Sequence, residues 1–238
     1  MRVNSARMSL EDVIARLGVG GIQAKTNPRA DTALSITEGS RRLRQDQLYA
    51  EGLIELQDAS SQAVIQALPS GQRALDFCAG GGGKALAMAA QGRDVTAYDI
   101  DPKRMSGLPE RAERAGARIA MATLSDLQDD APFDLVLCDA PCSGSGAWRR
   151  SPEGKWALTP ARLQDYNSKQ LAVLTQAAEF VAPGGCLVYA TCSLLRAENR
   201  DLISQFLHSN PSWQLTKDIA WPVDAFGDGF YTAHLTCG

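Results

Sequence analysis

Long apolar runs and histidines are both scarce in this sequence. No apolar segment approaches the about 20 residues that a membrane-spanning helix needs, and the opening MRVNSARMSL lacks the apolar core of a secretory signal. The chain holds 2 histidines and 6 cysteines, and no two cysteines form a CxxC pair. A metal site and a disulfide scaffold are therefore not expected, and a reducing cytoplasm is the predicted compartment.

The charge balance shows no excess of positive charge. Lys and Arg number 24 against 27 Asp and Glu, a formal net charge of −3, which argues against a protein that holds nucleic acid by bulk charge. A local basic patch remains compatible with this balance. Hydrophobic residues make up 45% of the 238 residues, which fits one large domain or one domain with a small appendage. No pattern defines the oligomeric state, and a monomer is favoured.

From residue 72 onward, short apolar segments alternate with helical ones. The predicted strands are RALDF, DVTAYD, ARIAMA, FDLVLCD and CLVYATC, and GFYTAHLT is predicted as an edge strand that runs antiparallel. The predicted helices are KALAMAAQG, PKRMSGLPERAERAG, TPARLQDYNSKQLAVLTQAAEFV and AENRDLISQFLHS, with a kink or break at Pro109. This alternation, with nearly continuous apolar strands, predicts an α/β fold: a mostly parallel sheet with helices on both faces.

The first 50 residues follow a different pattern. MRVNS is a candidate strand, SLEDVIARLG a helix that Ser9 and Asp12 cap, and GIQAKTN an extended segment. We expect a small βαβ appendage over residues 1–50, with RRLRQDQ as its densest positive charge, and a second, larger domain over residues 51–238.

Polar and glycine-rich segments follow the predicted strands, where ligands bind in parallel sheets. The loop CAGGGGK follows the first strand, and Asp99 ends the next one, 19 residues after Gly80. The loop could be only a tight turn, but with Asp99 it favours a nucleoside site. It lacks both GxxxxGK[ST] and a clean GxGxxG, so S-adenosylmethionine fits better than ATP or NAD. Lys84 could contact the cofactor carboxylate or sit at the rim of the loop.

Two cysteines, Cys142 in DAPCSGSG and Cys192 in LVYATCS, stand just beyond apolar strands. Buried cysteines are often simple hydrophobes, which is our expectation for Cys78, Cys138 and Cys186. A reactive thiolate needs a partly exposed, polar setting. Such a thiolate beside a methyl donor suits methylation of cytosine carbon 5, because addition at carbon 6 loads electron density onto carbon 5. Asp139 is placed to stabilise the charge at ring nitrogen 3.

At this point the sequence resembles a known family. LDFCAGGGGK, AYDIDPKR, FDLVLCDAPCSGSGAWRRSPEGKW and LVYATCSLLRAEN are similar to the RNA cytosine-5 methyltransferases of the bacterial Sun-like and eukaryotic nucleolar-protein group, which includes proteins like ribosomal RNA small-subunit methyltransferase B. QDASSQ and DGFYTAHL are similar as well. The resemblance implies a Rossmann-like, S-adenosylmethionine-dependent methyltransferase fold with a mostly parallel seven-stranded sheet. It also implies methylation of RNA, with ribosomal RNA expected before transfer RNA.

The resemblance also assigns roles to residues. It implies that Cys192 attacks carbon 6, that Cys142 helps to release the product, and that Asp139 holds the base. The residues it implies for the S-adenosyl-L-methionine site are Cys78, Ala79, Gly80, Gly81, Gly82, Lys84, Asp99, Arg104 and Asp139. The family loop usually reads Ala-Pro-Gly-Gly-Lys-Thr, whereas this chain has AGGGGKAL. Longer members carry helical RNA-binding material before the point that matches MRVNS, so a short member or a piece of a longer protein is expected.

An aromatic and basic segment after PCSGSG is the candidate RNA contact, because bases stack on aromatic rings and phosphates pair with cations. The candidate RNA-binding residues are Trp148, Arg149, Arg150, Lys155, Arg41 and Arg42, with Trp156 beside them. The alternative is that both tryptophans belong to the core and the arginines to an ordinary surface.

Three functions remain open from the sequence. The first is an RNA cytosine-5 methyltransferase. The second is a catalytically weak RNA-binding assembly factor that retains the fold, and the altered glycine loop favours it. The third is a methyltransferase for DNA or a small molecule.

Overall fold

The computed structural model describes residues 1–237 and contains a seven-stranded sheet with the strand order β10-β11-β9-β8-β5-β6-β7. The strands are β5 (Arg73–Asp76), β6 (Asp94–Ala97), β7 (Ile119–Met121), β8 (Phe133–Asp139), β9 (Val181–Thr191), β10 (Trp213–Trp221) and β11 (Phe230–Cys237). Strands β5 to β9 pair in parallel, while β11 runs antiparallel to both β9 and β10. The predicted α/β class and Rossmann-like sheet are confirmed.

One predicted position in the sheet is wrong. Strand β11 (GFYTAHLT in the prediction) is not an edge strand but lies between β9 and β10. Its residues from Phe230 to Leu235 are buried, as an interior strand covered on both faces requires. The edge is β10, which the sequence pattern did not predict. Its segment WQLTKDIAW exposes most of its side chains, so it has no continuous apolar signal.

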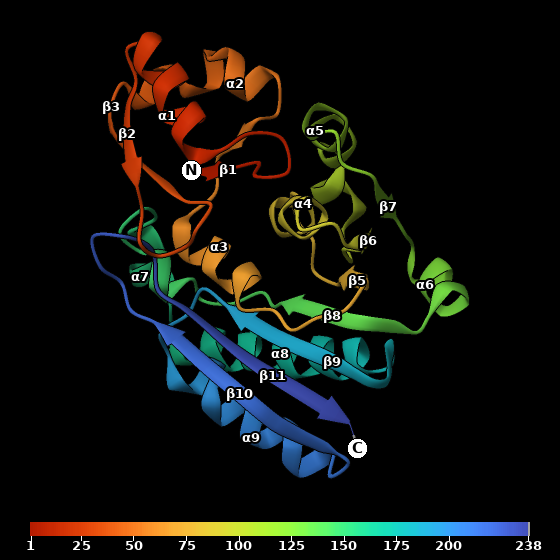
Figure 1. Cartoon of the computed structure of the whole chain (residues 1–238). Helices are drawn as coiled ribbons and strands as arrows, with labels where there is room; N and C mark the ends of the chain where they lie inside the picture. Colours follow the sequence, from red (N-terminus) through yellow and green to blue (C-terminus); the bar gives the residue numbers. More distant parts are fainter. Residues whose placement is uncertain (238) are drawn as a thin grey trace.

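Helices cover both faces of the sheet (Figure 1). Helices α3 (Ala59–Gln66), α4 (Gly83–Ala90) and α5 (Leu108–Ala115) pack on one face, and α8 (Pro160–Ala178) and α9 (Arg200–Ser209) pack on the other. Alternation along β8 explains the two cores: Leu135 and Leu137 face the first set of helices, whereas Val136 faces the second. The shorter helices are α6 (Leu124–Asp130), α7 (Glu153–Ala157), η2 (Pro102–Met105), η3 (Ser145–Ala147) and η4 (Arg196–Glu198).

The break expected near Pro109 takes the form of two separate helices. The 3₁₀ helix η2 ends at Met105, and α5 begins at Leu108 with Pro109 in its first turn. A proline is tolerated there because the first helical N–H groups have no intrahelical acceptor. Among residues 1–237, no helix combines the length and the apolarity that crossing a membrane requires.

The N-terminal unit differs from the expected βαβ arrangement. It contains β1 (Arg2–Val3), α1 (Leu10–Val19), β2 (Gln23–Thr26), β3 (Leu34–Glu38), η1 (Ser40–Gln45), α2 (Gln47–Ala50) and β4 (Ile54–Glu55). Its two strand pairs, β1 with β4 and β2 with β3, are both antiparallel, so no parallel crossover exists. The Ser9 cap of α1 is confirmed, since its hydroxyl accepts the amide of Asp12. The domain boundary at residue 50 stays a prediction.

A buried carboxylate attaches this unit to α5. Glu55 is 7% exposed, and its Oε2 lies 3.3 Å from both Arg111 Nε and Arg114 Nη2. The side chain of Asn4 adds two bonds, from its Nδ2 to the carbonyl oxygens of Gly52 and Ala115. The N-terminal unit is therefore fixed to the middle and the C-terminal end of α5.

We expect Glu55→Gln to lower the free energy of unfolding by about 3 kcal/mol, because it leaves two partly buried guanidinium groups without their counter-charge. Urea denaturation measures the change. Asp165→Asn is the matched control, because the Asp165–Lys169 pair is exposed on both sides and should contribute less than about 0.5 kcal/mol. Equal losses in the two variants would contradict the prediction.

Candidate active site at the carboxyl edge of the sheet

The two predicted cysteines meet at the carboxyl edge of the sheet. Cys142 follows β8 and Cys192 follows β9, and these parallel neighbours are in register up to Asp139 opposite Ala190. Their Sγ atoms lie 3.4 Å apart, within hydrogen-bond distance, and both residues are partly buried. Among the other cysteines, Cys138 and Cys186 are buried in the two cores, as expected of hydrophobes, whereas Cys78 is only partly buried.

The two thiols differ in their ionisation. The hydrogen bond to Cys192 and burial both raise the pKa of Cys142 well above the ordinary thiol value. The same hydrogen bond lowers the pKa of Cys192 despite burial, and the positive charge of Lys84 lowers it further. Of the two thiols, Cys192 therefore loses its proton more readily. The thiolate is the nucleophilic form of cysteine, so Cys192 is the stronger candidate for the attacking sulfur.

Lys84 lies beside this pair, in a place that neither sequence alternative described. Its Nζ is 2.5 Å from Asp139 Oδ2, and its side chain is 11% exposed. Although burial alone would lower the pKa of Lys84, the carboxylate of Asp139 raises it. The ammonium is therefore charged and joins the first turn of α4 to the end of β8. No local sequence pattern indicates this pairing, because the two residues are 55 positions apart.

The glycine loop between β5 and α4 has a backbone that only glycine adopts without strain. Gly80 has φ +51° and Gly82 has φ +77°. A Cβ at Gly82 would lie 2.3 Å from Leu108 Cδ1, so the loop packs directly against α5. Ala79 is held from the other side, since its amide donates to the carbonyl of Tyr98. The loop is a fixed backbone surface at the strand end.

Asp99 links the loop to a cavity. It is 3% exposed, and its Oδ2 accepts the amide of Gly80 at 2.8 Å and lies 3.0 Å from Arg104 Nη1. A cavity of about 380 Å³ opens beside Asp99 and is walled by apolar side chains that include Ile100, Met121 and Leu124. Near this cavity, the side chains of Thr123 and Asp126 form the capping box at the start of α6. The apolar walls suit the faces of a flat ring such as adenine, and Asp99 lies at the polar end of the cavity.

The sequence analysis missed Asp76, at the end of β5. The residue is 1% exposed, and within residues 1–237 neither of its carboxylate oxygens has a hydrogen-bond partner. Burial raises its pKa to about 7. Asp76, Asp99 and Asp139 thus lie around the loop together with three cations, Lys84, Arg104 and Arg111, the last of which donates to the carbonyl of Gly81. The carboxylates supply the negative charge with which the ammonium and sulfonium groups of a cofactor would pair.

The predicted RNA-binding segment is held by another buried carboxylate. Asp228 is 0% exposed, and its two oxygens accept Nε of Arg149 and Nε of Arg150 at 2.7 Å each. Trp148 is partly buried, and its indole N–H donates to the carbonyl of Ser143. Trp156 is 81% exposed, with Lys155 Nζ 5.4 Å from its ring centroid. Of the two tryptophans in this segment, Trp156 is thus the exposed one, with Lys155 over its ring.

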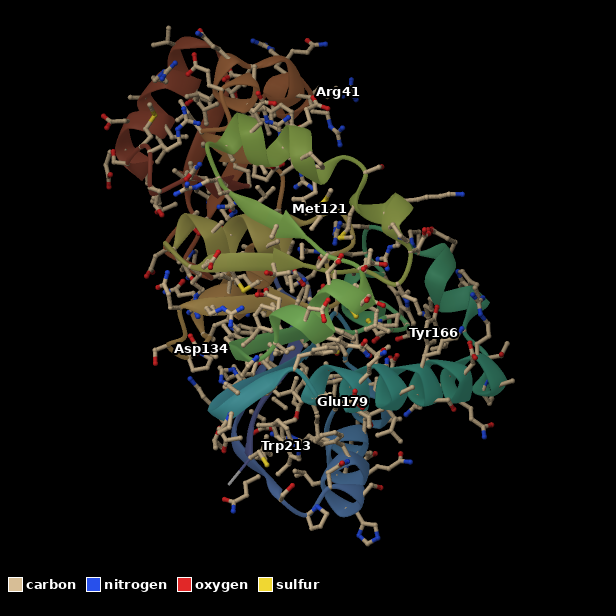
Figure 2. All side chains as sticks on the ribbon, turned by 90° about the vertical axis from the view of Figure 1, so that its right-hand side faces the viewer. Arg41, Met121, Asp134, Tyr166, Glu179 and Trp213 are labelled. Carbon is tan, nitrogen blue, oxygen red and sulfur yellow. The ribbon has the colours of Figure 1, made fainter. Side chains whose placement is uncertain are left out.

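The two remaining candidates lie on the N-terminal unit. Arg41 and Arg42 belong to η1, and Arg42 donates to the carbonyl of Gly20. Figure 2 shows Arg41 at the outer end of the molecule, with Trp213 at the other end. Their contact with RNA stays a prediction. In the part of the chain that the structure describes, no three His, Cys, Asp or Glu side chains are grouped so as to hold a metal ion.

Comparison with known proteins assigns this arrangement of fold and site to a family. The sequence profile described as 16S rRNA methyltransferase RsmB/F matches residues 63–236. The chain belongs to this family. The match covers the glycine loop, both cysteines and β11, and it confirms the family predicted from the motifs.

Individual relatives of the RsmB/F family agree with this assignment. The chain is 33% identical to the ribosomal RNA small subunit methyltransferase B of Klebsiella pneumoniae (strain 342), over 99% of this chain and 58% of that protein. It is 36% identical to the protein of the same name from Salmonella newport (strain SL254), over 79% of this chain and 48% of that protein. The chain thus spans about half the length of the curated relatives it matches.

A solved structure confirms the methyltransferase fold. The crystal structure of a methyltransferase homolog from Pyrococcus horikoshii superimposes with a TM-score of 0.83, at 27% identity, over 98% of this chain and 84% of that one. The RsmB/F family and this fold together confirm S-adenosyl-L-methionine as the predicted cofactor, and the carboxylate cluster and the cavity beside Asp99 fit it.

We expect Asp76 to make stability fall with rising pH. Its folded pKa of about 7 lies above the unfolded value of about 4, so between these values only the folded state holds the proton. Relative to Asp76→Asn, the free energy of unfolding of the wild type should fall by on the order of 4 kcal/mol from pH 4 to pH 7 and then stay level. Urea denaturation at several pH values measures this difference. The exposed Asp94→Asn sets the baseline, and a flat difference would refute the expectation.

Proposed function

We propose that this chain transfers a methyl group from S-adenosyl-L-methionine to carbon 5 of a cytosine in RNA, through a covalent bond between Cys192 and carbon 6. The observation that carries the proposal is the Cys142–Cys192 contact of 3.4 Å beside the Lys84–Asp139 ion pair. A thiolate, a proton donor and a charged pair at one strand end are the groups that this chemistry needs.

The first step uses the polarised thiol pair. Cys192 Sγ bonds to carbon 6, the double bond between carbons 5 and 6 breaks, and its electrons are delocalised over carbon 5 and ring nitrogen 3. As these electrons reach it, nitrogen 3 takes up a proton from solvent and donates it in a hydrogen bond to the carboxylate of Asp139, and the ammonium of Lys84 offsets the negative charge at that carboxylate. When bound, S-adenosyl-L-methionine supplies an electrophilic methyl group to carbon 5.

The release step needs the second thiol. The hydrogen on carbon 5 must leave as a proton, which water accepts, and the electron pair of the broken carbon–hydrogen bond then restores the double bond as the carbon–sulfur bond breaks. Cys142 lies next to the departing sulfur, so its S–H can stabilise the thiolate that forms again. This is the physical basis for assigning release to Cys142 and attack to Cys192.

We infer that the RNA is ribosomal and that it meets the protein along the segment after Cys142. The curated relatives are named for small-subunit ribosomal RNA. The target base must leave its stack to reach a thiol at a strand end. The exposed Trp156 can stack on a neighbouring base, while Arg149, Arg150 and Lys155 supply positive charge for phosphates. Arg41 and Arg42 extend this charge onto the N-terminal unit.

With labelled S-adenosylmethionine and small-subunit ribosomal RNA, Cys192→Ala should reduce methyl transfer to background, because the attacking sulfur is gone. Cys142→Ala should instead accumulate a protein–RNA adduct on denaturing gels, because release is blocked. Cys186→Ala, a thiol in the core, is the control and should retain activity. Methyl transfer by Cys192→Ala at the wild-type rate would eliminate the covalent mechanism.

Trp156→Ala should weaken binding of single-stranded RNA by roughly 5- to 100-fold, which corresponds to the loss of one stacked base. Fluorescence anisotropy at one fixed salt concentration measures the affinity. Trp213→Phe is the control, because Trp213 packs against Phe206 at the other end of the molecule (Figure 2). An affinity that Trp156→Ala leaves unchanged would remove this residue from the interface.

A further inference from the structure

A second carboxylate near the cysteines is wholly buried and is bound only by neutral groups. Glu198, the last residue of η4, is 0% exposed. Its Oε1 accepts the amide of Ser143 at 2.8 Å and Nε2 of Gln170 at 3.0 Å. Its Oε2 accepts the hydroxyl groups of Ser143 and Ser193, each at 2.5 Å. All four donor groups, one backbone amide, one side-chain amide and two hydroxyl groups, are uncharged.

The serines bound by Glu198 directly follow the two cysteines in the chain. Ser143 comes after Cys142 and Ser193 after Cys192, so one carboxylate joins the loop after β8 to the loop after β9. Gln170 of α8 also donates to the carbonyl of Pro141 at 2.9 Å. The backbone of Cys142 is therefore held on both sides by a single network that Glu198 completes.

A carboxylate is the group that this position requires. Burying one without a cation is costly, and a glutamine of the same shape would avoid that cost. A glutamine, however, has one acceptor oxygen, and its amide nitrogen would face a hydroxyl that now donates. Only a carboxylate accepts all four bonds at once. The four hydrogen bonds, which connect the two loops, offset the free-energy cost of burying the Glu198 carboxylate.

We propose that Glu198 is a positioning residue: its carboxylate fixes the two loops so that the sulfur atoms of Cys142 and Cys192 stay at hydrogen-bond distance. The use of this pair in catalysis rests on the proposed function, whereas its spacing and ionisation order do not.

The charges around the pair do not all act in one direction, and on Cys192 the effect of Asp139 is larger than that of Lys84. Besides the hydrogen bond and burial, the negative charge of Glu198 raises the pKa of Cys142. On the other side, Lys84 lowers the pKa of Cys192, while Asp139 opposes it. The titratable and charged groups that act on the two thiols are Lys84 of α4, Asp139 of β8, Tyr189 of β9, Glu198 of η4 and Arg150.

The test measures thiol reactivity without RNA or cofactor. Each protein is treated with iodoacetamide across a pH series, and mass spectrometry quantifies alkylation of Cys142 and of Cys192 separately. In the wild type, Cys192 should react faster than Cys142 near neutral pH. In Glu198→Gln, the ratio of the two rates should shrink by about tenfold, as the two ionisation midpoints converge.

Matched variants separate positioning from folding. Glu179→Gln is the control. Glu179 lies at the C-terminal end of α8, at the opposite end of that helix from Tyr166 (Figure 2), and it comes before β9, whereas Cys192 follows β9. The ratio of the two alkylation rates in this variant should equal that of the wild type. Ser143→Ala, which removes one donor and keeps the charge, should reduce the ratio by a smaller factor and serves where Glu198→Gln does not fold. An unchanged ratio in Glu198→Gln, or in Ser143→Ala where Glu198→Gln does not fold, overturns the proposal. If the wild type transfers no methyl group to RNA, the proposed function is refuted, but the result on the alkylation of the two cysteines still stands.

Discussion

The hydrogen bond between the sulfur atoms of Cys142 and Cys192 is the contact on which the site depends. It exists because β8 and β9 are parallel neighbours in register, so the loops that follow them begin at the same height. The hydrogen bond then gives two chemically identical thiols different pKa values, raised for Cys142 and lowered for Cys192. Lys84 and Asp139 complete the site from the adjacent loop and strand end. The parallel sheet thus supplies an asymmetric thiol pair that neither loop could supply alone.

Much of the fold was predictable because its signal is local. The segments RALDF and FDLVLCD are buried on both faces of the sheet, so each forms a nearly continuous apolar run that predicts a strand. The Ser9 cap of α1 and the start of α8 at Thr159 and Pro160 follow the rules for helix capping. The incorrect or missing predictions concern strands whose place in a sheet depends on residues far away in the sequence. The exposed β10 has no apolar signal, and the interior place of β11 depends on which strands it joins. The antiparallel pairing of β1 with β4 spans about 50 residues and leaves no local pattern.

The same division holds for the site. Cys142, Cys192, Asp139 and Asp99 could be predicted because each ends an apolar strand or follows one. Asp76, Glu198 and Asp228 were missed because a buried carboxylate is indistinguishable in sequence from a solvated one. Each is identified only by its hydrogen-bond partners in the structure. Among the described residues, the carboxylate oxygens of Asp76 have no such partner. Glu198 accepts bonds from four neutral donor groups, and Asp228 accepts bonds from two guanidinium groups. Side-chain partners, unlike strand ends, follow from tertiary packing.

The interior position of β11 has a consequence for how the protein is made. The segment that leads into this strand approaches the loop after Cys142 so closely that Gly229 donates its amide to the carbonyl of Gly146, and a Cβ on Gly146 would lie 2.1 Å from the carbonyl oxygen of Gly229. Gly146 in turn donates to the carbonyl of Cys192. Because β11 follows all other strands of the sheet in the chain, a growing polypeptide on the ribosome has every candidate catalytic side chain before it has the strand that seals their loops. Until β11 emerges and inserts beside β9, the nascent thiols stand at an open sheet edge.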